Sequence, residues 1–212
     1  TTQQAILDRS RELFNEHGLE SVGVRDLARD LGRSPGNVSY YFPKKEDLIA
    51  ALMDELAARN TANVAELTGA ESLANLLERY RRTFEAQYEY RFLARAIVHI
   101  IESFPKLAAR YREVETKRRR GLTTALESMI GTELQRDVGV ETLAVVVGTF
   151  TLVARFWLSE ARISFPGNEP QELIDHYIAI LAHTLWGPAT ASGRRSLRPL
   201  LTGVLANPVL GR

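Results

Sequence analysis

One short segment, residues 23–43, limits the fold of this 212-residue chain more than any other. Along its first half, apolar residues recur at steps of three and four, which predicts a short helix that ends at Gly32. Ser34 then caps a second helix, because its hydroxyl can accept a backbone N–H group and Pro35 suits the first helical position. This second helix runs to about Phe42. The apolar positions of the first helix are Val24, Leu27, Ala28 and Leu31.

The spacing of these two helices is that of a helix-turn-helix. Such a motif needs a first helix braced across the DNA backbone, a tight turn, and a second helix whose first residues enter the major groove. Many small helical hairpins share this spacing, so spacing alone does not separate a DNA-binding motif from a structural one. An amphipathic helix over residues 3–17, closed by Gly18, would complete a three-helix domain.

The rest of the chain consists of long segments with helical periodicity, and no segment alternates as a strand does. The last segment has a clear start at Asn168 and Pro170 and a clear end at Gly187. We therefore expect an all-α fold. The segments are Leu48–Leu56, Leu73–Tyr88, Leu93–Phe104, Leu107–Met129, Leu143–Leu158 and residues 168–187.

Several separate pieces of residues 6–52 carry a family resemblance, and they occur in the family's order. They are Leu13-Phe14 followed by Gly18, Val24-Arg25-Asp26-Leu27-Ala28, Leu31-Gly32, Ser34-Pro35-Gly36, and Tyr40-Tyr41-Phe42 followed by Lys45-Glu46-Asp47-Leu48. This stretch resembles the N-terminal domain of the TetR family of transcriptional regulators. The resemblance covers about a quarter of the chain.

The resemblance implies a division of the chain into three parts. Residues 1–47 would form a helix-turn-helix DNA-binding domain, and residues 48–188 a larger helical bundle for dimerisation and effector binding. Residues 189–212 hold four arginines and no acidic residue, and we expect a tail that is partly ordered or a short packed helix. A second DNA-contacting arm is the alternative interpretation of this tail.

The residues expected to contact DNA lie on the second helix of the motif and at its flanks. Asparagine can pair with an adenine edge, serine can bond either base type, and the small Gly36 allows close backbone approach. Arg25, Tyr41 and Lys45 are better placed for phosphates, as the corresponding family positions are. Val38 and Phe42, four residues apart, should be core. The expected DNA-binding set is Arg25, Ser34, Pro35, Gly36, Asn37, Ser39, Tyr40, Tyr41 and Lys45.

Two positions depart from the family pattern. Gly23 stands where the family usually has a serine or threonine, so the cap geometry is kept but the hydroxyl is lost. Ser39 stands where the family often has a tyrosine, so that contact is either missing, water-mediated or taken over by Tyr40. Neither departure breaks the expected fold.

Charge supports a local DNA contact rather than a basic protein as a whole. The net charge of the chain is +1, and residues 1–50 hold seven Lys/Arg against eight Asp/Glu, a net of −1. Residues 25–45 hold five basic and two acidic residues, a net of +3 by subtraction. Positive charge thus flanks an uncharged second helix.

The larger domain offers aromatic and polar residues for an effector pocket, although each one alone is more often a core residue. Arg155 stands out because a charge near the end of the apolar run Leu143–Leu158 needs a partner, which could be an acidic side chain, the other subunit or an anionic ligand. The candidate effector-binding residues are Phe84, Tyr88, Phe92, His99, Phe104, Phe150, Arg155 and Trp157.

The last two long helices, Leu143–Leu158 and residues 168–187, are apolar along more than one line, whereas one line is enough for a helix to face its own core. A second subunit would cover the other line, in the four-helix bundle that the family resemblance implies. The expected dimer interface is Ile174, Ile178, Leu181 and Leu185.

These features together predict a homodimeric transcriptional regulator. We expect a repressor that leaves a palindromic operator in double-stranded DNA when an unknown small-molecule effector binds; a ligand-independent regulator and an activator are the alternatives. The absence of cysteine and of an export signal at the start favours the cytoplasm. The sixteen-residue apolar run is short for a membrane span, so we expect a buried helix and no membrane partner.

Enzyme and metal functions have weaker support. Gly32-Arg33-Ser34-Pro35-Gly36 matches the G-x-S-x-G pattern of a hydrolase, but that nucleophile requires a preceding strand and a sheet. His176 and His183 could share a helix face, yet no carboxylate pattern of the zinc kind accompanies them. We therefore expect no catalytic residue, no metal and no cofactor.

Overall fold

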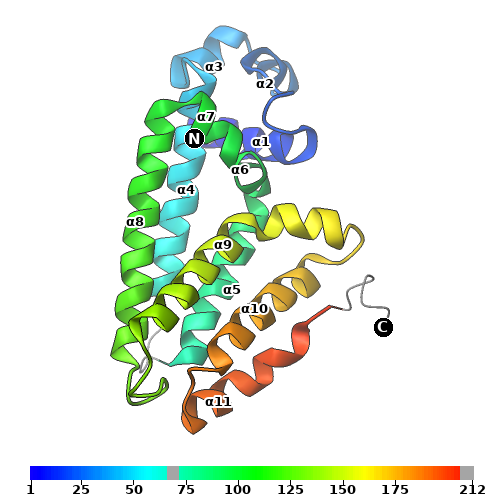
Figure 1. Cartoon of the computed structure of the whole chain (residues 1–212). Coiled ribbons are helices and arrows are strands. Elements are labelled where there is room, and N and C mark those ends of the chain that lie inside the picture. Colours follow the sequence, from blue (N-terminus) through cyan, green and yellow to red (C-terminus); the bar gives the residue numbers. More distant parts are fainter. Residues whose placement is uncertain (66–71, 206–212) are drawn as a thin grey trace.

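The computed structural model describes residues 1–65 and 72–205 (Figure 1). The described chain is helical, and its β structure is limited to two isolated bridges. The expected tail extends beyond it, so Arg212 lies outside the described residues. The elements are α1 (Thr2–His17), α2 (Val24–Asp30), α3 (Pro35–Tyr41), α4 (Lys45–Ala65), α5 (Leu73–Glu89), α6 (Arg91–Arg95), α7 (Ile97–Ser103), α8 (Pro105–Ser128), α9 (Val140–Ser164), α10 (Pro170–Trp186), α11 (Ala191–Leu197) and η1 (Arg198–Gly203).

The first three helices form where the sequence predicts them. Gly18 and Gly32 adopt φ angles of 85° and 62°, which a residue with a Cβ rarely adopts, and so end α1 and permit the turn after α2. Ser34 caps α3 by accepting the N–H of Asn37 at 3.2 Å, with Pro35 at the first helical position. We call α1–α3 the reading domain.

The core of the reading domain extends into the larger part of the molecule. Buried residues of α1–α3 and of the first half of α4 pack together with α6, and the rings of Phe14 and Phe92 lie 5.1 Å apart between their centres. Val38 and Phe42 are 0% and 3% exposed, so the predicted core pair is confirmed. The orientation of the reading domain is therefore fixed by α4 and α6.

A second core joins α5, α9 and α10. Phe84 stacks on Trp157 with ring centres 5.0 Å apart, and Tyr177 lies 5.6 Å from the same indole. The indole N–H of Trp157 donates to the Gln87 side chain at 2.7 Å, so its polar atom is satisfied inside the core. These helices form the bundle in the lower half of Figure 1.

The segment Leu93–Phe104, predicted as one helix, is two. The chain bends at Ala96, whose φ and ψ of −95° and 8° are not helical, between α6 and α7. No glycine or proline marks this bend in the sequence. Packing provides the reason, because α6 lies against α9 and α1 whereas α7 lies against α8.

The four α10 residues expected at the dimer interface do not lie on the surface of the chain. The apolar line assigned to a partner lies instead in the core of its own chain, because α11 and η1 fold back along α10 (Figure 1). The N–H of Leu205 donates to Nδ1 of His176 at 3.0 Å, and this bond fixes the end of η1 on α10. The four residues, each at most 2% exposed, are Ile174, Ile178, Leu181 and Leu185.

The apolar run Leu143–Leu158 lies within the 25-residue helix α9, which is long and apolar enough by length and composition to cross a membrane. The expectation of a buried helix holds for one of its faces only. Val146, Phe150 and Trp157 are buried, but only 28% of the most apolar 18-residue stretch of the helix is buried inside the molecule. A helix that covers a protein core can be as long and as apolar as a membrane span, so length and composition do not separate the two cases. The face of α9 that points away from the core is uncovered in the described chain.

Gly193 should be the position in the tail that is least tolerant of change. A Cβ there would lie 2.2 Å from the carbonyl oxygen of Glu133, so Gly193→Ala should destabilise the fold by about 1–3 kcal/mol. Gly187→Ala is the matched control, because its φ is −59° and nothing lies within 4 Å. Urea unfolding of both variants measures the difference, and equal midpoints would contradict the docked tail.

Candidate nucleic-acid interface

The start of α3 is the most exposed part of the reading domain. Ser34, Pro35 and Gly36 are exposed, and a Cβ on Gly36 would meet no atom closer than 4.0 Å. Val38 faces the opposite way, into the core. The first turn of α3 can therefore approach a flat or grooved partner without obstruction.

Polar groups on this turn already have local partners. The Ser34 hydroxyl accepts the cap bond from Asn37, which leaves its own hydrogen to donate elsewhere. The Asn37 side-chain oxygen accepts a long bond of 3.4 Å from Arg33. Two-point pairing of Asn37 with adenine needs that oxygen, and its second lone pair can accept the adenine amino group while Arg33 holds the first.

The two tyrosines at the end of α3 face different ways. Tyr40 is 81% exposed, whereas Tyr41 is half-buried against the domain core, and their rings meet edge-on at 5.1 Å. Adjacent helical residues point about 100° apart, which explains the difference. Ser39 is half-exposed beside them, and an exposed aromatic ring next to it is suited to contact.

The side chain of Lys45, predicted to contact a phosphate, turns toward the domain in this structure without DNA. Its ammonium donates to the carbonyl oxygen of Leu19 and lies 5.7 Å from the centre of the Phe14 ring. Partial burial lowers its pKa from the ordinary value. Lys44 is exposed instead, and its backbone N–H is bound by Asp47 at 2.9 Å. Two adjacent lysines look alike in sequence, and only packing decides which one turns inward.

The cap of α2 is formed without a side-chain hydroxyl, as the sequence predicts. Gly23 has an extended conformation, with φ and ψ of −101° and 171°, and its N–H donates to the Asp26 carboxylate at 3.0 Å. Arg25 follows in the first turn and is exposed. With Lys44 it flanks the start of α3, which agrees with the local positive charge of residues 25–45.

Contacts that sequence reasoning missed hold the reading domain in place. Arg9 of α1 bonds Asp30 at the end of α2 through two nitrogens, and this keeps the pKa of the Asp30 carboxyl below its ordinary value. Asn15 of α1 donates to the carbonyl of Glu89 at 2.8 Å and accepts the N–H of Phe92 at 3.1 Å. The second pair spans the break between α5 and α6.

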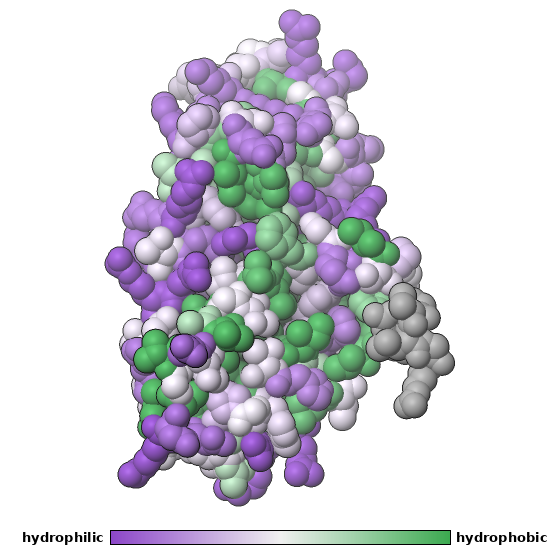
Figure 2. All heavy atoms as spheres, viewed as in Figure 1, coloured by the Kyte–Doolittle hydropathy of each residue, from purple (hydrophilic) through white to green (hydrophobic). Residues whose placement is uncertain are grey.

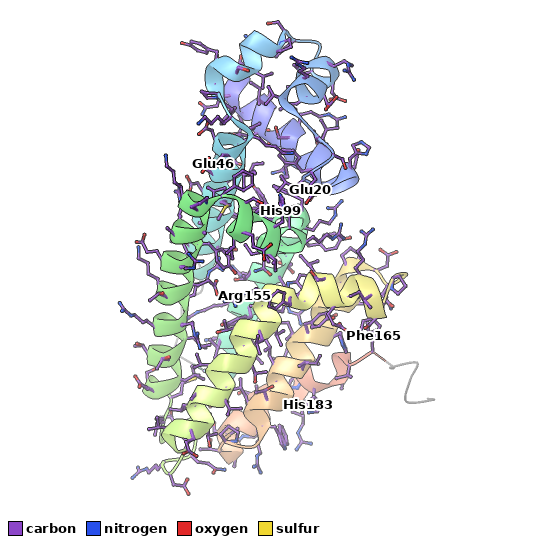
Figure 3. All side chains as sticks on the ribbon, turned by 45° about the horizontal axis from the view of Figure 1, so that its top comes forward. Glu20, Glu46, His99, Arg155, Phe165 and His183 are labelled. Carbon is purple, nitrogen blue, oxygen red and sulfur yellow. The ribbon has the colours of Figure 1, made fainter. Side chains whose placement is uncertain are left out.

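A further link joins α7 to the loop after α1. Nδ1 of His99 lies 3.2 Å from a carboxylate oxygen of Glu20, and Figure 3 shows both at the junction of the two parts. His99 also meets Phe104 edge-on at 6.2 Å. These residues thus belong to the junction.

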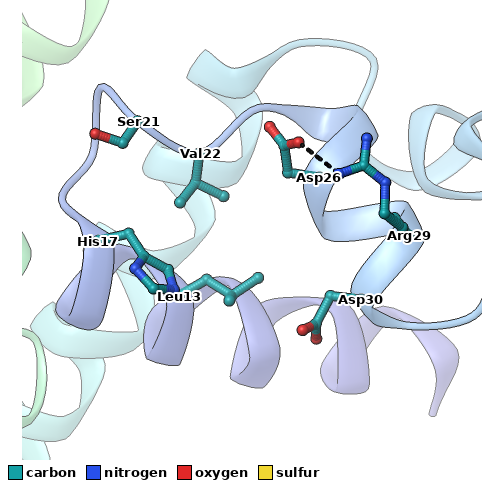
Figure 4. Close-up of a pocket in the computed structure, with 7 residues that line it drawn as sticks. All are labelled: Leu13, His17, Ser21, Val22, Asp26, Arg29 and Asp30. Atoms are coloured by element: carbon teal, nitrogen blue, oxygen red, sulfur yellow. Dashed lines mark ion pairs between the residues drawn. The ribbon is translucent and has the colours of Figure 1, made fainter.

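A shallow hollow lies between α1, the following loop and α2 (Figure 4). Its charged groups are already engaged, since Asp26 bonds Gly23 and pairs with Arg29, and Asp30 bonds Arg9. It is lined by Leu13, His17, Ser21, Val22, Asp26, Arg29 and Asp30. We assign no ligand to it.

The sequence matches two family models that together span most of the chain. Residues 6–52 match the model described as bacterial regulatory proteins, tetR family, and residues 50–197 match TetR, described as bacterial transcriptional repressor. The chain belongs to the TetR family. The three-helix reading domain followed by a helical bundle is the architecture of this family of transcriptional regulators.

Curated relatives align with this chain over part of their length. The HTH-type transcriptional repressor AcnR of Corynebacterium diphtheriae is 40% identical over 75 residues, which are 35% of this chain and 40% of that protein. The HTH-type transcriptional regulator UidR of Escherichia coli is 32% identical over 65 residues, which are 31% of this chain and 33% of that protein. The aligned part is thus at most about two fifths of these relatives' lengths.

Solved structures resemble the whole chain at low sequence identity. A TetR-family regulator from Marinobacter aquaeolei VT8 has a TM-score of 0.85 and 20% identity, covering 97% of this chain and 100% of that one. The ketosteroid regulator KstR2 of Mycobacterium tuberculosis has a TM-score of 0.63 and 21% identity, covering 90% and 95%. At these identities the likeness shows the fold alone.

The TetR-family assignment agrees with the surroundings of Ser34 in the G-x-S-x-G pattern. Helices α2 and α3 flank it in the described chain, where a nucleophile elbow would need a strand on one side. His176 and His183 of α10 do not share a site, since His176 is buried against η1 and His183 is exposed (Figure 3).

The structure places the residues predicted to bind an effector in different parts of this TetR-family chain. Phe84, Phe150 and Trp157 are at most 1% exposed within the bundle core, and Tyr88 is half-buried at its edge. Phe92 belongs to the core shared with the reading domain. Because aromatic side chains fill cores as readily as pockets, sequence alone did not separate these roles.

Arg155 has an acidic partner inside the molecule. An acidic side chain was one of the three partners that the sequence predicted, beside the other subunit and an anionic ligand. Its guanidinium donates to Glu115 of α8 at 2.9 Å and to the Tyr111 hydroxyl at 3.3 Å. Arg118 binds the same carboxylate at 2.9 Å. Figure 3 shows Arg155 near the middle of the molecule, between α8 and α9.

Removing a phosphate contact should act equally on all DNA sequences. Arg25→Ala and Lys44→Ala should each weaken binding to operator DNA and to random DNA by the same factor. Each should also reduce the slope of log affinity against log salt concentration by about one. Lys45→Ala should leave the slope unchanged and lower the thermal midpoint, because its ammonium is bound inside the domain. Fluorescence anisotropy over a salt series tests this, and a reduced slope for Lys45→Ala alone would reverse the assignment.

Proposed function

We propose that this protein is a cytoplasmic repressor that binds a palindromic operator as a homodimer and leaves it when a small-molecule effector binds. The exposed first turn of α3 carries the DNA-binding part of the proposal. The proposed contacts are Arg25, Ser34, Pro35, Gly36, Asn37, Ser39, Tyr40, Tyr41 and, in place of Lys45, Lys44. We keep residues 1–47, 48–188 and 189–212 as the proposed functional division.

An uncovered apolar face on α9 supports the homodimer. Four large apolar side chains on this face are exposed, by 66%, 58%, 38% and 80% in chain order, and they recur at steps of seven, four and seven. Thr149 and Ser159 lie between them on the same line, and the exposed Glu160, four residues after Phe156 and bound by the Tyr177 hydroxyl, borders it. We call this the α9 stripe; its apolar members are Val145, Leu152, Phe156 and Ile163.

A second copy of the chain is the occupant that fits the α9 stripe. A two-fold axis brings the same surface of both copies together, so an uncharged helix face can cover itself without a complementary partner. Hydrophobic residues gather on this face of the molecule in Figure 2, among polar ones. The proposed interface therefore keeps α9, one of the two helices expected in the four-helix bundle, and replaces the four α10 residues by the α9 stripe. Two reading domains related by this axis would meet half-sites about 34–36 Å apart.

The contacts at the end of α5 support communication between the bundle and the reading domain. Gln87 is 8% exposed, and its amide donates to the carbonyl of Ala154 on α9 at 3.2 Å while its oxygen binds Trp157. Two residues later, Glu89 is bound by Asn15 of α1. A ligand that shifts α9 against α5 would therefore move α1, and the two conformations would differ in DNA affinity.

Selection of operator DNA from random fragments tests the function. The purified protein should enrich one palindromic sequence, and DNase protection should cover both half-sites. An Asn37→Ala, Tyr40→Ala double variant, changed on the reading surface only, should lose enrichment while keeping its thermal midpoint. A selection that enriches no sequence would overturn the proposal.

Charge on the α9 stripe should break the dimer without unfolding the chain. Leu152→Glu puts a carboxylate where two copies would meet, and light scattering should then report monomers with unchanged helical circular dichroism. Val98→Glu is the matched control, because Val98 is 53% exposed on α7 and lies outside the stripe. A dimer that persists in Leu152→Glu would exclude this interface.

A further inference from the structure

The middle of α8 lies at an opening in the bundle. The buried residues of this helix are Leu107 and Ala108 in its first turn and Leu122 and Leu126 near its end. No residue between Ala108 and Leu122 is buried, and residues 116–121 are all exposed. Six consecutive residues cover more than one turn, so they include the side of α8 that faces the other helices. At this height the inward side of α8 is open to solvent.

Charged side chains occupy the inward side of α8 at this opening. Arg118 follows the buried Leu107 by eleven residues, or about three turns, so the two residues lie on the same side of the helix. The Arg118 guanidinium donates to Glu115 at 2.9 Å, and the same carboxylate accepts a bond from Arg155 of α9 at 2.9 Å. Two guanidinium groups therefore share one carboxylate, which leaves one positive charge in excess. We call Glu115, Arg118 and Arg155 the shared-carboxylate site.

The shared-carboxylate site can accept a second anion from solvent. Glu115 is 14% exposed in its side chain, whereas Arg118 is 41% exposed and uses one of its five N–H donors for that carboxylate. An arriving carboxylate can bind the exposed side of Arg118 while Glu115 stays with Arg155, and two one-to-one pairs then form. Apolar surface adjoins these charges, since the Arg155 guanidinium lies 5.9 Å from the centres of the Tyr111 and Phe156 rings.

A buried amide on α4 also lacks partners. Asn60 is 8% exposed, and neither the nitrogen nor the oxygen of its side chain has a hydrogen-bond partner. An unpaired polar group inside a protein destabilises the fold, so a native chain that keeps one has a use for it. The amide offers both a donor and an acceptor to a bound molecule.

Asn60 lies at the height of the shared-carboxylate site. Helices α4 and α8 run side by side in the same direction, since their first turns line one hollow and Arg110 pairs with Asp54 (Figure 1). Asn60 is six residues beyond Asp54, and Glu115 is five residues beyond Arg110. At 1.5 Å per residue, both lie about 8–9 Å further along their helices.

We propose that the shared-carboxylate site and Asn60 together bind the effector, and that this effector is a small organic carboxylate with a second polar group. Arg118 pairs with its carboxylate, the Tyr111 ring contacts its body, and Asn60 bonds its polar group. One molecule of this class satisfies both the excess positive charge and the unpaired amide. The inference rests on the proposed function, because it names the class of its effector.

The position of the shared-carboxylate site connects it to DNA binding. Arg155 follows Ala154, whose carbonyl accepts the amide of Gln87 on α5 at 3.2 Å. An anion that takes Arg118 from Glu115 changes how Arg155 is held, and with it the position of α9 against α5. That contact is the one through which we propose that the bundle moves the reading domain.

Titration of three related molecules without DNA tests the site. 4-Hydroxybenzoate has a carboxylate and a hydroxyl, 4-hydroxybenzamide has the same shape without the charge, and benzoate lacks the hydroxyl. Ligand-observed NMR at constant ionic strength, with chloride as the balancing salt, gives each dissociation constant. 4-Hydroxybenzoate should bind saturably. The amide should bind about tenfold more weakly, because it loses charge-assisted bonds, and benzoate about fivefold more weakly, because it loses one neutral bond.

Single variants separate the two parts of the site. Arg118→Gln should remove the preference for 4-hydroxybenzoate over its amide. Arg119→Gln is the matched control, because it removes an exposed charge from the next position of α8, and it should keep that preference. Asn60→Leu should remove the preference for 4-hydroxybenzoate over benzoate. Without ligand, Asn60→Leu should have a higher thermal midpoint than wild type, because an apolar side chain of similar size replaces an unpaired amide.

Three outcomes would overturn the inference. They are no saturable binding of 4-hydroxybenzoate, an equal loss of affinity in Arg119→Gln and Arg118→Gln, which would mean attraction by the charged surface as a whole, and an Asn60→Leu variant that still prefers 4-hydroxybenzoate over benzoate. Failure of the proposed function is separate, since it appears as no operator enriched while 4-hydroxybenzoate still binds.

Discussion

The two cores of this protein meet at the break between α5 and α6, and that junction holds the reading domain to the bundle. On one side, Gln87 is buried and bonds to Ala154 and Trp157 of α9. On the other, Asn15 of α1 bonds across the break to Glu89 and Phe92. Breaking the hydrogen bonds of a buried amide is costly, so movement of α9 must either pass to α1 or break the bonds that Gln87 makes.

Apolar surface explains how the rest of the molecule is assembled. Helix α10 is apolar on two lines, and its own tail covers one of them, with Leu197 fully buried and Gly193 held against Glu133. Helix α9 has no such cover, and its second face stays open. The chain thus covers the second apolar face of α10 by folding back on it, and it leaves the second face of α9 available for a second copy.

Most charged side chains that lie between helices are paired with the opposite charge. Arginine–carboxylate pairs join helices at five contacts, and the bundle contact between α8 and α9 is centred on Glu115. The reading surface is uncharged on α3 and positive at its flanks, which suits phosphates beside a groove.

The sequence by itself determined the local elements. Gly18, Gly32 and the Ser34 cap define where the helices of the reading domain begin and end, because backbone conformation and capping depend on neighbouring residues. The all-α class, the family and the Val38–Phe42 core pair follow from the same local patterns.

Only the tertiary structure decided which side each ambiguous residue faces. Lys44 and Lys45 are equivalent in sequence, but the carbonyl of Leu19 lies within reach of one only. Ile178 and Leu181 belong to a second apolar line on α10. Whether a partner subunit or the tail of the same chain covers this line depends on segments distant in the sequence. Periodicity reports that a face is buried. The packing of the whole chain decides what buries it.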